Sequence, residues 1–242
     1  MEKRTLKHNI ILGILFFLPV IFLLFLYPAQ HHYNALDIVK SNVIDLNNFE
    51  SSTGEKILLE EHITVLGFLG KAPMEQVIAA SNVKELIYDK FKGFKKFQVV
   101  MVAPFGSEDE AELLKKEIIS YDELDYWHFL FAEEDDISAL YDSLQSDTKL
   151  DGSLVSQQIF IIDKELNQRG RLDDRSDNEL AKNKPIYSLI SYNCIEVAEI
   201  KNKMSEDIRI LFTEYRQKRK GKFDSTTRRA EDLNTAHGEQ EN

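Results

Sequence analysis

Apolar residues along the chain fall into short runs separated by segments with helical spacing. Ile63–Leu69, Phe97–Ala103 and Trp127–Ala132 are near-continuous apolar runs of strand length, which is typical of central buried strands. Between the first two runs, Pro73 opens a helical stretch that extends to about Lys92. A proline suits the first turn of a helix, where its missing N–H has no partner to lose. The pattern therefore predicts strands that alternate with helices.

The alternation continues into the second half of the chain. Ser107–Glu110 has the capping-box pattern that starts a helix, and the acidic run Glu133–Asp136 complements the dipole at the start of the next one. We interpret this acidic run as a solvated helix start rather than a metal site. The remaining predicted elements are two hairpin strands at Ile159–Asp163 and Gln168–Leu172 and a long helix from Ile195 to about Lys220.

The resulting order, βαβαβαββα, predicts an α/β domain with a thioredoxin-like sheet and helices on both faces. Strands joined through helices are expected to pair in parallel by right-handed crossovers, and the tight hairpin must be antiparallel. We place this domain at residues 56–220. Residues 28–55 are interpreted as a linker with edge strands at Ala35–Val39 and Val43–Leu46, and residues 221–242 as a disordered tail.

One uncharged run near the N-terminus has a different character. Ile10–Tyr27 contains eighteen residues, which span roughly 27 Å as a helix, close to the thickness of a bilayer core. A cleaved signal peptide has a shorter apolar region and a small-residue cleavage site, so we predict an uncleaved transmembrane anchor at residues 10–27. Basic residues lie in the stub 1–9, so the positive-inside rule places the N-terminus in the cytoplasm and the following domain outside it, in the periplasm of a bacterium.

Charge and cysteine content restrict the possible functions. The chain carries a formal net charge of −11, which argues against nucleic acid as a partner because phosphate binding requires clustered Lys and Arg. Its single cysteine excludes an internal disulfide framework, a CxxC redox pair and a multi-cysteine zinc site. The sequence therefore predicts neither a metal site nor a bound cofactor.

In an open α/β sheet, reactive groups gather beyond the carboxyl ends of the strands. Here the loop after the first central strand, Gly70-Lys71-Ala72-Pro73, leads into a helix N-terminus. Such a position stabilises a thiolate through the helix dipole and the free amides. A redox or metal-binding version of this fold would have cysteines there, and this chain has none.

At this point the sequence resembles the Sco family, which comprises membrane-anchored, thioredoxin-fold copper-delivery proteins that help assemble cytochrome c oxidase. The resemblance covers roughly residues 56–215 and the anchor, and depends on the layout and on the segment IFIIDKELNQRGRLD. It includes Arg169-Gly170-Arg171-Leu172-Asp173 after the hairpin turn. No proline precedes the strand at Ile159–Asp163, where thioredoxins carry one, which favours a Sco-like domain over thioredoxin itself.

The positions that would bind copper in that family differ in this chain. The family motif is a CPxxxC-type loop, with a histidine about eight residues before the hairpin aspartate. Here Pro73 is kept, but Ala72 or a neighbour stands at the first cysteine position, Gln76 near the second, and Val155 at the histidine position. Without thiolates, Cu(I) lacks its preferred ligands and thiol–disulfide exchange lacks both partners. The resemblance thus implies a degenerate active-site loop formed by Gly70, Lys71, Ala72, Pro73 and Gln76, together with Val155.

Few other residues are candidates for chemistry. Cys194 is a possible reactive thiol near the start of the last helix, although a small, partly buried residue is the simpler interpretation. We interpret His31 and His32 as juxtamembrane linker, and His62 and His128 as structural. The basic cluster Arg216–Lys222 suits a helix C-terminus, and contact with anionic lipid remains an alternative.

These observations predict a non-catalytic binding or accessory factor, held at the inner membrane by residues 10–27, with a protein partner there. The resemblance extends this expectation to cytochrome c oxidase assembly. Two alternatives remain open. One is a thiol-dependent redox enzyme that uses Cys194, and the other is a diverged thioredoxin-like domain with no connection to the oxidase.

Overall fold

The computed structural model describes residues 12–22, 35–119 and 124–219, in two compact units, Met1–Asn34 and Ala35–Asn242. In the first unit the described residues form a helix at 12–22. No helix among the described residues combines the length and apolar character needed to cross a membrane. The basic stub at 1–9, the remainder of the predicted anchor at 10–27 and the predicted tail at 221–242 lie outside the described residues.

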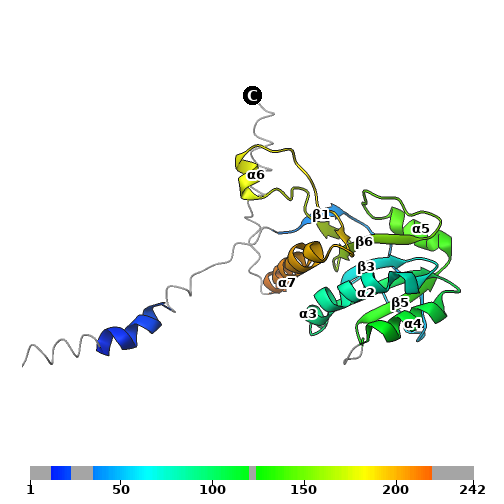
Figure 1. Ribbon diagram of the computed structural model, residues 1–242, viewed down its shortest axis with the longest axis horizontal. Helices are drawn as coiled ribbons and strands as arrows, with labels where there is room; N and C mark the ends of the chain where they lie inside the picture. The colour runs from blue at the N-terminus through cyan, green and yellow to red at the C-terminus, as the bar shows by residue number, and fades with distance from the viewer. Residues whose placement is uncertain (1–11, 23–34, 120–123, 220–242) are drawn as a thin grey trace, which may run out of the picture. The chain divides into compact units, whose positions relative to one another are not determined.

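The second unit is built on one mixed sheet (Figure 1), whose strand order is β1-β7-β6-β3-β4-β5-β2, with β8 paired to β6. β3, β4 and β5 are parallel, whereas β6, β7 and β1 continue the sheet in antiparallel steps and β2 pairs antiparallel with β5. The strands are β1 (Asp37–Lys40), β2 (Glu50–Ser51), β3 (Ile63–Leu69), β4 (Phe97–Pro104), β5 (Trp127–Ala132), β6 (Val155–Ile162), β7 (Gln168–Gly170) and β8 (Tyr192–Asn193).

Helices connect most of these strands. A continuous helical stretch begins at Pro73, as predicted, and changes its hydrogen-bond pattern along its length. Its parts are η1 (Pro73–Gln76), α2 (Val77–Val83), the π-helical η2 (Lys84–Tyr88) and α3 (Asp89–Phe91). The remaining helices are α4 (Glu108–Ile118), α5 (Glu134–Asp142), α6 (Asp177–Ala181), the π-helical η3 (Glu199–Met204) and α7 (Ser205–Arg219). In Figure 1, α6 lies on an arm away from the sheet.

Two apolar cores lie on opposite faces of the sheet. Successive side chains of a strand point to opposite faces, so Ile63 and Val65 of β3 enter one core while Leu66 and Phe68 enter the other. The first core is closed by α2, α4 and α7, and the second by α5 together with buried residues between 43 and 59. The predicted α/β class with helices on both faces is therefore confirmed.

The direction of β6 differs from the prediction. Although α5 connects β5 to β6, β6 runs antiparallel to β3, with Val155 paired to Leu69. The reason is the polar segment 143–154 after α5, which returns the chain to the end of the sheet from which α5 started. β6 then enters beside the carboxyl end of β3 and must run in the opposite direction.

Two local predictions also require correction. Val43–Leu46 forms no strand, but Val43 and Leu46 are buried as part of the second core. The expected capping box at Ser107 is absent, because its hydroxyl donates to the carbonyl oxygen of Pro104 at 2.5 Å. A capping box does form at Ser176 and Glu179, where the serine has the extended backbone that the motif needs.

A buried guanidinium ties the N-terminal strand, the hairpin and the last helix together. Arg169, which is 3% exposed, donates through Nη1 to Asp163 at 2.9 Å and through Nη2 to Glu214 at 2.6 Å. The same Nη2 atom donates to the carbonyl oxygen of Leu36 at 2.8 Å. Burial opposes the charge of Arg169, but the two carboxylates outweigh this effect and raise its pKa.

We expect Arg169→Ala to lower the free energy of unfolding by about 3–5 kcal/mol, because it leaves two buried carboxylates without their cation. Urea denaturation of the full chain measures the change. Arg216→Ala is the control: this arginine is exposed and has no ion pair within the described residues, so its effect should stay within about 0.5 kcal/mol. Equal effects of the two substitutions would contradict a structural role of the buried guanidinium.

Candidate functional site

The loop after β3 is shaped by a glycine and a proline. Gly70 has φ +68°, in the left-handed region that favours glycine, and the amide of Lys71 donates to the carbonyl oxygen of Ser153 at 3.1 Å. Pro73 is buried as the first residue of η1, and Ala72 beside it is half-buried. The chain thus turns sharply at the carboxyl end of β3 and starts a helix, which is the local arrangement that the sequence predicted.

The structure brings Gly70 and Val155 together. Leu69 pairs with Val155 across β3 and β6, and a Cβ added to Gly70 would lie 2.3 Å from Val155 Cγ2 and 2.4 Å from the carbonyl oxygen of Ser153. Val155 and the loop, which the sequence analysis grouped together, therefore lie directly against each other in the structure. An apolar valine side chain packs at this point, where a ligand-binding version would need a polar group.

Charged side chains surround the loop at its exposed side. Lys71 Nζ forms an ion pair with Glu134 at the start of α5, at 2.6 Å, and both side chains are about half exposed. The amide of Met74 donates to Glu110 of α4 at 3.5 Å. The loop is thus linked to the first turns of two helices, but exposed pairs of this kind contribute little to stability. The rim of the loop is therefore charged and exposed.

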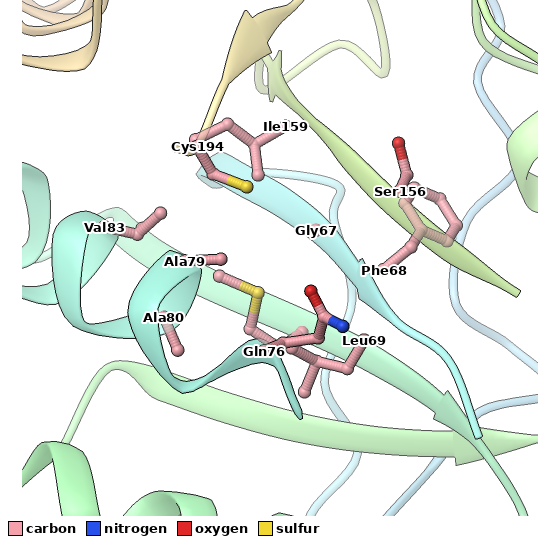
Figure 2. Close-up of a pocket in the computed structure, with 11 residues that line it drawn as sticks. Gly67, Phe68, Leu69, Gln76, Ala79, Ala80, Val83, Ser156, Ile159 and Cys194 are labelled. Atoms are coloured by element: carbon pink, nitrogen blue, oxygen red, sulfur yellow. The ribbon is translucent and has the colours of Figure 1, made fainter. Parts of the chain in front are cut away.

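A small apolar cavity of about 10 Å³ lies between β3, α2 and the segment that contains Cys194 (Figure 2). This volume is at the lower limit for one water molecule. Figure 2 shows Gln76, at the end of η1, and Cys194 directed toward the cavity, together with Ala79 and Ile159. The structure thus places Gln76 on the same cavity as Cys194, the only thiol of the chain, and it places Gly70, Lys71, Ala72 and Pro73 outside the cavity lining.

The environment of Cys194 disfavours a thiolate. Its side chain is 3% exposed, its backbone amide donates to the carbonyl oxygen of Gln157 at 2.8 Å, and its own carbonyl accepts from Asn82 at 3.0 Å. Burial in this apolar position raises the pKa of the thiol to about 11. A nucleophilic cysteine needs the opposite, a depressed pKa and access to a substrate.

The histidines do not assemble a metal centre in the described part of the chain. His62 contacts the carbonyl oxygen of Glu60 at 3.0 Å, and burial in β5 lowers the pKa of His128. Across residues 12–22, 35–119 and 124–219, no group of three or more His, Cys, Asp or Glu side chains is placed to hold a metal ion. His31 and His32 lie outside these ranges.

Sequence reasoning missed a second ionic cluster, which surrounds Arg171. This side chain donates to Asp207 at 2.5 Å and to Asp174 at 3.0 Å, and Lys203 also donates to Asp174 at 2.5 Å. Tyr192 donates its hydroxyl to Asp207 at 2.6 Å. The sequence Arg169-Gly170-Arg171 could have indicated this cluster, because side chains two positions apart in a strand point to the same face of the sheet. The cluster fixes the start of α7 and the base of the arm that carries α6.

Known proteins are similar to this chain in structure but not in sequence. No protein-family model and no curated protein matches the sequence. BsSco, a member of the Sco family of cytochrome c oxidase assembly proteins, is 16% identical with a TM-score of 0.47, over 73% of this chain and 96% of its own. Copper-bound ScoI from Arabidopsis thaliana is 12% identical with a TM-score of 0.40, over 70% and 98%. Yeast mitochondrial 1-Cys peroxiredoxin is 15% identical with a TM-score of 0.41, over 79% and 80%.

These similar structures are Sco-family and other thioredoxin-like proteins. At such identities and TM-scores the likeness carries no inference about activity. The assignment of the α/β class depends instead on the strand order, the strand directions and the two covered faces of the sheet.

We expect Gly70→Ala to destabilise the protein by at least about 2 kcal/mol, because a left-handed φ is costly for alanine and its Cβ would overlap Val155 and the carbonyl of Ser153. Gly93→Ala is the matched control, since a Cβ at Gly93 has no neighbour within 4 Å. Thermal and urea denaturation of both variants measure the two changes in stability. A neutral Gly70→Ala would mean that the loop does not pack against Val155.

We expect native Cys194 to react with iodoacetamide at pH 8 about 100-fold more slowly than an ordinary exposed thiol, because a pKa of about 11 leaves little thiolate. The rate should rise as the pH approaches 11. Ile195→Cys in a Cys194→Ala background is the control, because Ile195 is the next residue and is 40% exposed. Mass spectrometry follows both reactions, and equal rates at pH 8 would contradict a buried thiol.

Proposed function

We propose that this protein is a membrane-anchored binding or accessory factor whose thioredoxin-like domain has lost redox and copper chemistry. The observation that carries the proposal is the packing at the loop after β3. Val155 lies against Gly70, and the loop 70–73 offers no thiol, imidazole or carboxylate. By the sequence resemblance, this loop corresponds to the position where such domains bind copper or exchange disulfides, and here it lacks the groups that this chemistry needs.

Residues 10–27 anchor the chain in the inner membrane, with the N-terminus in the cytoplasm and the compact unit in the periplasm. Support for this part comes from the length of the uncharged run and from the basic residues that precede it. The sequence resemblance to the Sco family points to a protein partner in cytochrome c oxidase assembly. Ion pairing of Lys71 with Glu134 keeps the rim of the loop polar and exposed, as suits contact with a protein.

The alternative of a redox enzyme requires Cys194 to be accessible and ionised. Cys194 is buried and the pKa of its thiol is raised, and both properties weigh against that alternative. Its side chain lines a small cavity together with Gln76. The remaining alternative, a diverged domain with no connection to the oxidase, differs from the proposal only in the identity of the partner. Affinity purification of the full chain from solubilised membranes separates the proposal from this alternative. Oxidase subunits or assembly factors that are recovered with the chain support the oxidase role.

We expect the purified full chain in detergent to retain no stoichiometric Cu(I) and to show no disulfide reductase activity, because the loop lacks thiolates. Elemental analysis after Cu(I) loading and an insulin-reduction assay measure the two properties. The variant Ala72→Cys/Val77→Cys/Val155→His is the matched control: it creates the CPxxxC spacing around Pro73 together with the histidine, and it should gain copper. One equivalent of Cu(I) bound by the unmodified chain, or reductase activity that Cys194→Ser abolishes, would overturn the proposal.

A further inference from the structure

Three exposed cations converge where α3 lies beside the last helix (Figure 1). Lys201 and Arg209 stand four residues before and four residues after Ser205, so all three positions lie on one side of η3 and α7. Lys90 of α3 reaches the same side, where its Nζ donates to the hydroxyl of Ser205 at 3.4 Å. The cations come from two distant parts of the chain, and each of them is exposed.

The charges of these cations are not balanced by carboxylates. In the part of the chain that the structure describes, none of the three forms an ion pair. Asp89, the residue before Lys90, pairs with Lys84 at 3.1 Å instead. Desolvation beside α7 lowers the pKa of Lys90, and the positive charges of Arg209 and Lys201 lower it further. The cations therefore repel one another, and an anionic ligand would relieve this repulsion.

A pair of stacked aromatic rings adjoins the cations. Phe212 lies one helical turn after Arg209, and its ring stacks on that of Phe94 with the centroids 4.2 Å apart. Phe94 is 40% exposed, and buried Phe91 supports the pair from the core at 5.8 Å from Phe212. An apolar face is thus held in contact with water next to the cations. We call these residues together the basic aromatic surface: Lys90, Phe94, Lys201, Arg209 and Phe212.

The basic aromatic surface is separate from the loop after β3. Phe94 shortly precedes β4, which begins at Phe97, whereas the loop follows the end of β3 at Leu69. Because β3 and β4 are parallel, the beginning of β4 and the end of β3 lie at opposite ends of the sheet. A ligand of this surface therefore does not occupy the candidate site, and its binding depends on the compact unit alone.

We infer that the basic aromatic surface binds an acidic segment of a partner protein, in which Asp or Glu residues flank a large apolar side chain. Charge complementarity selects the acidic residues, and the exposed ring pair selects the apolar side chain between them. Nucleic acids and anionic bilayers are extended polyanions, which the net charge of −11 on the chain repels. A short acidic segment meets less of this repulsion, because it contacts the cations without lying along the rest of the domain.

The test titrates short dye-labelled peptides with the full chain in detergent and follows their fluorescence anisotropy. The probe peptide has glutamates on both sides of a central Phe-Leu pair. One control peptide carries Ser-Ser in place of this pair, and the other carries glutamines in place of the glutamates. We expect the probe to bind at micromolar concentrations and each control at least about tenfold more weakly, because each lacks one of the two recognised features. About 0.5 M salt should also weaken binding of the probe, because it screens the charges.

Substitutions in the chain locate the binding surface. Lys90→Glu/Arg209→Glu should weaken binding of the probe at least about tenfold, and Phe94→Ser should weaken it by a similar factor. Lys116→Glu/Lys182→Glu is the matched control, because it makes the same change in net charge at two exposed lysines on α4 and after α6. Its effect on the affinity should stay below about twofold, since charges far from the ligand are screened. Thermal melting of each variant confirms that it folds.

Each opposite result would overturn the inference. Equal losses of affinity in the two double variants would mean that only net charge matters, and equal binding of the Ser-Ser peptide would exclude the ring pair from the surface. Absence of probe binding up to about 1 mM would exclude the surface itself. An oligodeoxythymidine of the same charge, or micelles that contain phosphatidylglycerol, could bind more tightly than the probe and depend equally on Lys90 and Arg209. That result would assign the surface to a polyanion. None of these results bears on the proposed function, which depends on the loop after β3.

Discussion

The arrangement of the compact unit depends on the position of one buried cation. Arg169 binds two carboxylates and a backbone carbonyl that come from three distant parts of the chain. A guanidinium suits this task because its planar array of donors can satisfy several acceptors at once and stays charged when buried. Asp163 is further stabilised by the amides of Glu165 and Asn167 at 3.0 and 2.9 Å. The tight turn between β6 and β7 is therefore built on the same carboxylate that holds Arg169.

This constraint extends to the candidate site. By fixing the β6–β7 hairpin against α7 and β1, it sets where β6 lies beside β3 and which residue faces the loop. Val155 then packs against Gly70, and the loop is closed over an apolar contact. The contact is filled by a valine side chain, which has no group that could bind a metal ion or exchange a disulfide.

The sequence predicted most of the elements around which the sheet is built, because β3, β4 and β5 are long apolar runs and the helix at Pro73 has a clear start. It could not predict the direction of β6, since direction depends on where the polar segment 143–154 brings the chain. Two-residue strands such as β8 leave no periodic pattern. The arginine clusters were missed for a different reason: charged residues are expected at the surface, and only tertiary contacts reveal that Arg169 is buried.

For the candidate site, the sequence predicted a loop after the first central strand that leads into a helix at Pro73, whereas the proximity of residues that are distant in the sequence had to come from the structure. Cys194 is more than a hundred residues from Gln76, yet both border one cavity.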